Sequence, residues 1–381
     1  MSTQSTHIVV VGGGTGGTVV ANRLADELRG EIDAGDAEVT LVTDGPEHVY
    51  KPMFLYVAFN RKDPADSRRP HRELLDQRVT LRIDRVTDIE TDAHQVICEE
   101  RDEPLQYDKL VVATGATLDP ESVDGLADNG HHFYSASGAE ALRDELASFT
   151  EGHLVLSTIG MPHMCPAAPV EFVLIADEWF RKRDCREDID ITYTYPLETA
   201  HAKQAIADWV TPVFDDRDID LETSFEVETV DSETVTTTDD RTLDHDLFVG
   251  IPPHAGGDLT SRADLGEEWI EVDQHTLEAT QADNVYALGD ATDVPTSKAG
   301  SAAHYQAGVV ADRLASDVRG HAPTARYDGK TLCFVEAGLD EATFVKFHYG
   351  EEPVVREPSQ FIHWAKLAYN ESYWLTARGL L

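Results

Sequence analysis

The 381-residue sequence is poor in positive charge. It has 31 lysines and arginines against 71 aspartates and glutamates, which gives a formal net charge of −40. Nucleic acid and anionic lipid headgroups would repel such a chain, so we expect no nucleic acid partner. A large excess of carboxylates keeps a protein hydrated in concentrated salt, and the composition therefore predicts a halophilic source. In dilute salt, where repulsion is less screened, we expect the fold to lose stability.

Closely spaced cysteines and long apolar runs are also missing. The four cysteines, Cys98, Cys165, Cys185 and Cys333, include no C-x-x-C pair. That spacing argues against a zinc ribbon or a thioredoxin-type motif, and we expect no metal site. No run of about 18 apolar residues could span a bilayer, and nothing resembles a signal peptide. These absences predict a protein made and kept in the cytoplasm.

What the sequence does contain is a buried strand followed by a glycine turn. The β-branched run at 7–11 is typical of a parallel strand, and a helix is predicted over 18–28. Between them lies G-x-G-x-x-G, formed by Gly12, Gly14 and Gly17, with Thr15 inside it. The first glycine allows a tight turn, the second lets a pyrophosphate approach, and the third lets the helix pack on the strand. The motif therefore predicts a dinucleotide at the helix N-terminus.

The second predicted strand, 37–44, ends in Asp44. An acidic residue at this place binds the adenosine ribose in dinucleotide folds, although Asp44-Gly45 is also a turn signal and Asp44 could act as a cap. The aromatic stretch at 50–57 occupies a loop position. It could line the pocket of a flat ring or form core, and its sequence favours neither.

Three stretches in this order resemble one family: Gly12 to Gly17, then Val112-Ala113-Thr114-Gly115, then Val285-Tyr286-Ala287-Leu288-Gly289-Asp290. Together they are similar to flavoproteins with two dinucleotide-type domains, namely disulfide reductases, type II NADH dehydrogenases and sulfide:quinone oxidoreductases. The resemblance implies FAD as the cofactor. It also implies the cofactor-binding residues Gly12, Gly14, Thr15, Gly17, Asp44, Thr114, Gly115, Gly289 and Asp290.

The same resemblance implies an α/β fold of two Rossmann-like, three-layer domains with a C-terminal segment for quinone and membrane contact. We expect a discontinuous FAD-binding domain at 1–115 and 280–325. A second Rossmann-like domain that carries the central cysteine is expected at 116–279, followed by a quinone and membrane-associated region at 326–381. The oligomeric state is left open, and a homo-oligomer is compatible with the sequence.

The second strand-to-helix turn indicates which branch of the family the chain resembles. Residues 160–166 contain one glycine where an NADH site needs three, and Pro162 and Pro166 lack the N–H groups that a pyrophosphate would use. Cys165 stands there instead, ahead of a helix predicted over 167–180, and a helix N-terminus should lower its pKa. With Cys333 near the C-terminus, this pattern looks like a sulfide:quinone oxidoreductase.

Each cysteine also has a plainer interpretation. Cys165 could be a small buried hydrophobic residue, and Cys333 lies in an apolar run that reads as a strand. Many members of the family have a third cysteine between the domains, which in some tethers FAD. Residues 116–152 contain none, so the resemblance here implies FAD held without a covalent bond.

Acid and base groups are expected near the sulfur site, because sulfide oxidation releases protons. Glu171 matches a glutamate of the family and could act as the base, or it could be a solvated helix carboxylate. His132 and His201, with His131, stand where the family often has histidines near the sulfide channel. Lys298 falls beside the predicted flavin-facing turn, where its charge would stabilise a reduced flavin or form a surface salt bridge.

The tail at 361–381 is rich in Trp, Tyr, Phe and Leu and resembles an amphipathic interfacial segment. Because a quinone dissolves in lipid, we expect this tail to make the peripheral contact with the membrane. The residues expected around the quinone ring are Phe334, Phe344, Phe347 and Tyr349. The alternative is a dimer or domain interface.

The resulting hypothesis is an FAD enzyme that oxidises sulfide through Cys165 and Cys333 and reduces a membrane quinone. Two alternatives stay open. One is a type II NADH:quinone dehydrogenase, and the other is a flavin-binding sulfur carrier without quinone turnover.

Overall fold

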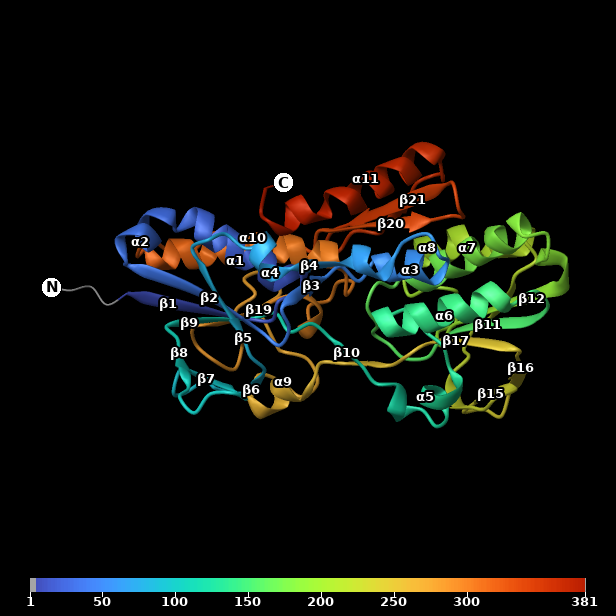
Figure 1. The fold of residues 1–381 in the computed structure, drawn as a ribbon, viewed down its shortest axis with the longest axis horizontal. Helices are drawn as coiled ribbons and strands as arrows, with labels where there is room; N and C mark the ends of the chain where they lie inside the picture. The colour runs from blue at the N-terminus through green and yellow to red at the C-terminus, as the bar shows by residue number, and fades with distance from the viewer. Residues whose placement is uncertain (1–4, 381) are drawn as a thin grey trace.

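A five-stranded parallel sheet forms the core of the N-terminal half in the computed structural model, which describes residues 5–380 (Figure 1). The strand order is β19-β9-β1-β2-β5. The bounds are β1 (Thr6–Val11), β2 (Ala37–Thr43), β5 (Val79–Ile83), β9 (Lys109–Val112) and β19 (Val285–Ala287). In register, Val10 pairs with Leu41 on one side and with Val111 on the other. The glycine turn therefore leaves the sheet from its central strand.

Both faces of this sheet are covered, which explains its nearly continuous apolar strands. Helices α1 (Thr15–Glu27) and α10 (Gly300–Val318) pack together on one face. The antiparallel strands β6 (Val86–Glu90), β7 (Gln95–Cys98) and β8 (Leu105–Gln106) lie on the other (Figure 1). All three layers contribute to one hydrophobic core.

A second parallel sheet has the order β13-β12-β11-β17. Its strands are β11 (Gly152–Thr158), β12 (Ile189–Thr194), β13 (Asp220–Glu222) and β17 (Leu247–Ile251). Its helices are α6 (Ala136–Ser148), α7 (Ala168–Lys182) and α8 (Gln204–Asp216). The two parallel sheets confirm the predicted α/β class.

Residues 227–244 lie outside this parallel sheet. This stretch folds into two antiparallel strands that turn back on each other, and a third extends them, in a small sheet outside the parallel one. The three are β14 (Val227–Val230), β15 (Thr234–Thr237) and β16 (Thr242–Asp244).

The C-terminal residues form an antiparallel sheet and one long helix that bridge the two halves (Figure 1). The elements are β20 (Thr331–Glu336), β21 (Ala342–Phe347), β22 (Val354–Val355) and α11 (Gln360–Ala377). Strand β20 contacts α10 of the first half and α7 of the second, and α11 contacts α1. Within residues 5–380, no helix combines the length and the apolar character needed to cross a membrane.

Shorter elements connect these parts. The aromatic stretch at 50–57, placed in a loop by the sequence, largely folds into the buried helix α3. The short elements are α2 (Arg29–Ala34), β3 (Glu47–Val49), α3 (Met53–Ala58), β4 (Arg68–Pro70), α4 (His71–Leu74), β10 (Thr117–Leu118), α5 (Leu126–Asn129), β18 (His254–Ala255) and α9 (Asp258–Arg262), with 3-10 turns at Pro64–Ser67, Pro120–Ser122, Arg186–Asp188 and Gly289–Ala291.

Candidate active site

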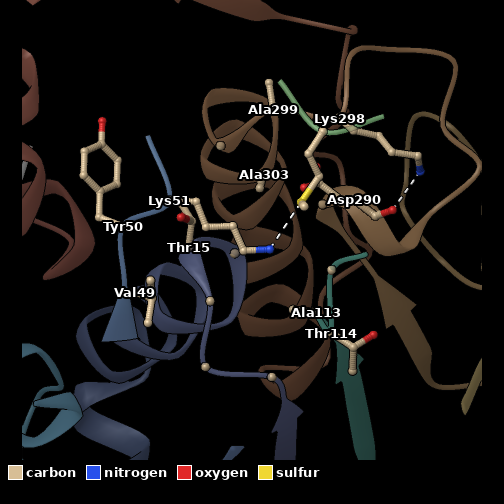
Figure 2. A pocket seen from close by; sticks show the side chains of 18 of the residues that line it. Thr15, Val49, Tyr50, Lys51, Ala113, Thr114, Asp290, Lys298, Ala299 and Ala303 are labelled. Atoms are coloured by element: carbon tan, nitrogen blue, oxygen red, sulfur yellow. Dashed lines mark hydrogen bonds between the residues drawn. The ribbon is translucent and has the colours of Figure 1, made fainter. Parts of the chain in front are cut away.

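A cavity of about 880 Å³ extends from the glycine turn to the C-terminal strand β20. Its walls come from the first parallel sheet, from α7 of the second half and from α11, and Figure 2 shows side chains that line it. Most residues predicted to act on a cofactor or on sulfur line this one cavity: Gly12, Gly14, Thr15, Asp44, Thr114, Gly115, Cys165, Glu171, Gly289, Asp290, Lys298 and Cys333. The cavity therefore unites segments that are far apart in the sequence.

The glycine turn has the geometry of a phosphate cradle. A Cβ added at Gly12 would lie 2.4 Å from the carbonyl oxygen of Ala113, and one at Gly17 would lie 1.8 Å from that of Gly12. A Cβ at Gly14 would meet no atom within 4 Å, because this glycine faces the open cavity. Helix α1 begins directly after Gly14 with no side-chain cap, so its first N–H groups are free to bind an anion.

The rest of the cavity fits the remainder of FAD. Asp44 lines it beyond the end of β2, where an adenosine ribose is bound in dinucleotide folds. Gly115 and Gly289 have positive φ angles of 74° and 75°, which glycine adopts without strain. Burial raises the pKa of Asp290, and the nearby ammonium groups of Lys51 and Lys298 oppose that shift. Gly17 does not line the cavity, because it packs beneath the turn.

Both candidate cysteines are free thiols at the same cavity. Cys165 lies between β11 and α7 with a φ of 47°, an unusual value for a residue with a side chain. Its N–H donates to the carbonyl oxygen of Lys298 at 2.7 Å, which ties this turn to the FAD-binding half. Cys333 reaches the cavity from β20. The two thiols are close enough for Cys333 to affect the pKa of Cys165.

The expected lowering of the Cys165 pKa is wrong. Burial raises the pKa of Cys165, and the Glu171 carboxylate and Cys333 raise it further. The N–H of Ala168 in the first turn of α7 and the ammonium of Lys366 favour the thiolate, but they do not offset burial. Burial and Glu171 likewise raise the pKa of Cys333 to about 12. A helix N-terminus thus contributes less here than desolvation does.

Glu171 is a buried residue of α7 and not a solvated helix carboxylate, since it is only 4% exposed. Its Oε1 atom accepts the N–H of Glu336 at 2.7 Å and forms an ion pair with Lys366 of α11. Burial raises the pKa of Glu171, and Lys366 opposes the shift. A carboxylate that is held next to two thiols and has a raised pKa is suited to accept a proton.

Two lysines approach the cavity in different ways (Figure 2). Lys298 donates to the carbonyl oxygens of Asp290 and Thr292 at 2.7 and 3.1 Å, and its Nζ lies 3.3 Å from the ring centre of Trp269. Burial lowers its pKa to about 8. Lys51, which the sequence did not single out, extends across the cavity to Met164, with its Nζ 3.2 Å from the sulfur.

The predicted histidines do not line the cavity. His201 is buried behind the Cys165 turn, where its Nδ1 accepts the N–H of Lys203 at 2.9 Å and burial lowers its pKa to about 4. His132 packs at the start of α6 with its Nδ1 accepting the N–H of Tyr134, and burial lowers its pKa as well. Of the predicted aromatic lining, Phe334 reaches the cavity, whereas Phe344, Phe347 and Tyr349 do not.

Helix α11 has two faces, and the sequence reading recognised only one. Phe361 and Trp364 are 76% and 58% exposed, in line with an interfacial face. On the opposite face, Lys366, Asn370 and Tyr373 are buried and line the cavity. The hydroxyl of Tyr373 lies 2.7 Å from Oγ1 of Thr15 in the glycine turn. Their spacing of three to four residues is the signal that could have identified this inner face.

Comparisons with known proteins agree with this geometry. Residues 6–159 match the family model described as pyridine nucleotide-disulphide oxidoreductase. The mitochondrial sulfide:quinone oxidoreductase of Mus musculus is 25% identical over 373 residues, covering 92% of this chain and 80% of that protein. Its counterpart in Dictyostelium discoideum is 26% identical over 364 residues, with 91% and 78% covered.

Solved structures support the fold. The sulfide:quinone oxidoreductase of Aquifex aeolicus superposes with a TM-score of 0.88 at 21% identity, covering 98% of this chain and 92% of that one. The NDH2 of Plasmodium falciparum, solved with NADH, gives a TM-score of 0.74 at 13% identity, with 98% and 97% covered. Because both share the architecture, the fold alone does not separate their activities.

Proposed function

We propose that this chain is an FAD-dependent enzyme that oxidises sulfide and reduces a membrane quinone, because its sequence is similar to those of sulfide:quinone oxidoreductases over most of its length. The observation that carries this proposal is the meeting of Cys165 and Cys333 in the cavity that begins at the glycine turn. When bound, FAD supplies a two-electron acceptor for sulfide oxidation and a donor for the quinone.

The two cysteines would do the sulfur chemistry. In the oxidised enzyme we place a disulfide between Cys165 and Cys333. Hydrosulfide attacks one sulfur of this bond, the disulfide breaks, and a new sulfur–sulfur bond forms a persulfide while the other cysteine leaves as a thiolate. The proton of the hydrosulfide is at first carried by the persulfide and is then transferred to Glu171. The electron pair of the sulfide has then reduced the disulfide, so both atoms and charge balance.

The second strand-to-helix turn supports sulfide over NADH as the donor. The space beside Gly160 is filled, since an added Cβ would lie 2.9 Å from the Cα of Pro253. Pro162 and Pro166 supply no N–H groups. This turn therefore lacks the open backbone that Gly14 gives to the first turn, and it presents Cys165 to the cavity instead.

We propose that the quinone binds at the C-terminal region. Phe334 of β20 and Tyr369 of α11 line the cavity with ring centres 5.8 Å apart. The exposed Phe361 and Trp364 on the outer face of α11 give a short apolar surface for peripheral contact with a membrane. Because the chain is strongly acidic, apolar insertion and not charge would hold the protein there.

A stopped-flow experiment tests the proposal. The purified protein with bound FAD is mixed anaerobically with sulfide or with NADH, and then with a soluble quinone, while the flavin absorbance is followed. We expect sulfide to bleach the flavin, quinone to restore it, and NADH to do neither at a comparable rate.

The other outcomes identify the alternatives. Bleaching by NADH and not by sulfide would overturn the proposal in favour of a type II NADH dehydrogenase. Persulfide formation on the protein without reoxidation by quinone would indicate a sulfur carrier.

A further inference from the structure

Five polar side chains from four elements meet beside the two thiols in what we call the α11 polar cluster. They are Tyr56 of α3, Glu171 of α7, Glu336 of β20, and His363 and Lys366 of α11. None of the five is more than 7% exposed. Only Glu171 was expected from the sequence to take part in catalysis.

The cluster is continuous from Glu171 to His363. Lys366 pairs with Glu171 and holds its Nζ 3.7 Å from Oε1 of Glu336. The other carboxylate oxygen of Glu336 lies 2.8 Å from Nδ1 of His363. Tyr56 donates its hydroxyl hydrogen to Oε1 of Glu336 at 2.6 Å. Each member thus lies within hydrogen-bond or ion-pair distance of the next.

A purely structural role explains this cluster poorly. Burying two carboxylates, an ammonium and an imidazole is costly, and apolar side chains of similar size often pack such a space at least as stably. The pKa values of the buried groups reflect the cost of burying charge. Burial raises the pKa of Glu171 and of Tyr56. Burial disfavours the charged form of Lys366, yet Glu171, Tyr56 and Glu336 together raise its pKa and keep it protonated.

The two ends of the cluster lie in different surroundings. At the inner end, Glu171 and Lys366 line the cavity, and both act on the pKa of Cys165 and Cys333. At the outer end, a hydrogen bond from Lys182 lowers the pKa of Asp340, and His363 is near enough to add to that shift. The Asp340 side chain is 61% exposed and pairs with Lys182 at the surface. The cluster therefore joins the thiol cavity to the surface beside α11.

We propose that Glu336, Lys366 and His363 form a proton path between Glu171 and the surface; this inference rests on the proposed function and extends it. The ammonium of Lys366 first passes one of its protons to Glu336, and the neutral amine that results then accepts the proton that Glu171 took from the persulfide. Glu336 passes a proton to Nδ1 of His363, which gives up its other ring proton toward Asp340 and water. One proton enters, one leaves, and no electrons move along the path.

Other titratable groups face this path and must be considered in its pH dependence. Cys333 comes from β20, Asp340 follows that strand, and Tyr369 lies on α11 near Cys333, while Cys165 approaches from the turn before α7. The thiols and Tyr369 have raised pKa values. Tyr369 therefore keeps its hydroxyl proton near neutral pH and does not carry protons along the path.

The test replaces His363 by asparagine, whose amide nitrogen can still donate to Glu336 but cannot relay a proton. We expect sulfide to bleach the flavin of H363N roughly 100-fold more slowly, with a larger solvent isotope effect in D2O and an altered pH profile. In H363A, added imidazole should restore the rate, and substituted imidazoles should do so according to their pKa. His321→Asn, at an exposed position after α10, is the matched control and should change nothing.

The outcomes separate this inference from the proposed function. If sulfide bleaches the wild-type flavin and H363N behaves like wild type, the path is wrong while the function stands. A slower H363N with an unchanged isotope effect and no imidazole rescue also overturns the path, because it indicates a structural role only. If sulfide does not bleach the flavin of the wild type, the flavin is reduced by light instead, and proton uptake is followed with a pH indicator. Proton uptake must then be slower in H363N than in the wild type. Equal rates of proton uptake refute the path.

Discussion

The two strand-to-helix turns of the parallel sheets occupy equivalent places but present opposite chemistry. After β1, Gly14 faces an open cavity and α1 begins with free N–H groups. After β11, Pro253 fills the space beside Gly160, and the turn presents a thiol at Cys165. The same topology therefore gives an open glycine turn in one half and a turn that presents a thiol in the other. A few residues in each turn, and not the surrounding sheet, determine whether the turn is open to a phosphate or presents a thiol.

The largest effect is expected from closing the first turn. Gly14→Val would place a side chain in the open space that we assign to the pyrophosphate, so we expect the protein to fold and to lose its FAD. The ratio of flavin to protein absorbance measures the loss, and circular dichroism checks the fold. Gly30→Ala, another position with open space around the added Cβ, should keep the flavin. FAD retained by G14V would remove the basis of the contrast between the turns.

The second turn is tested through its thiol. Cys165→Ala should keep FAD bound but abolish the bleaching of the flavin by sulfide, because no sulfur atom remains for the persulfide in that turn. Cys185→Ala is the control, since this cysteine lies after α7 and does not line the cavity. Full turnover in C165A would show that the second turn is not the sulfur site.

A smaller effect is expected on thiol reactivity. Glu171 raises the pKa of Cys333, which stands at about 12. Glu171→Gln removes that negative charge, so the pKa should fall and more thiolate should be present at any pH below it. Mass spectrometry of the Cys333 peptide after timed alkylation should show a faster reaction across the pH range. Glu145→Gln, on α6 and away from the cavity, should leave the rate unchanged; a slower reaction in E171Q would contradict the assigned sign.

The smallest effect is common to both halves and comes from net charge. With a formal charge of −40, the folded chain repels itself, and salt should raise its melting temperature as screening shortens the Debye length to about 3 Å at 1 M. We expect a rise of roughly 5 °C between dilute and molar KCl, followed by calorimetry at saturating FAD. The flavin-to-protein ratio should stay constant. A melting temperature that falls with salt would contradict the predicted halophilic character.

Local patterns in the sequence were sufficient for the first turn and for much of the fold. The β-branched strand, the spacing of Gly12, Gly14 and Gly17, and the helix after them are all local features. The gathering of Cys165 and Cys333 at one cavity was anticipated only through the family resemblance, since nothing local to either cysteine indicates the other.

The missed features depend on contacts between distant segments. The pKa of Cys165 was assigned the wrong direction because a helix N-terminus is visible in the sequence, whereas burial beside Glu171 is not. Lys366 and His363 were read as part of a lipid-facing tail, although they occupy its inner face. Lys51 had no local signal, because its position across the cavity is fixed by the fold.

Strand β20 is in contact with helices of both halves and carries Cys333 between them. During synthesis the glycine turn emerges first, whereas β19, Gly289 and Asp290, which complete the first sheet and its side of the cavity, emerge only shortly before residue 333. Until residue 333 has emerged, the incomplete chain contains Cys165 but not Cys333, and α11 does not yet cover the cavity. Under the proposed function, the order of the polypeptide would thus withhold sulfur chemistry from a chain that ends just before β20, even when its first parallel sheet is complete.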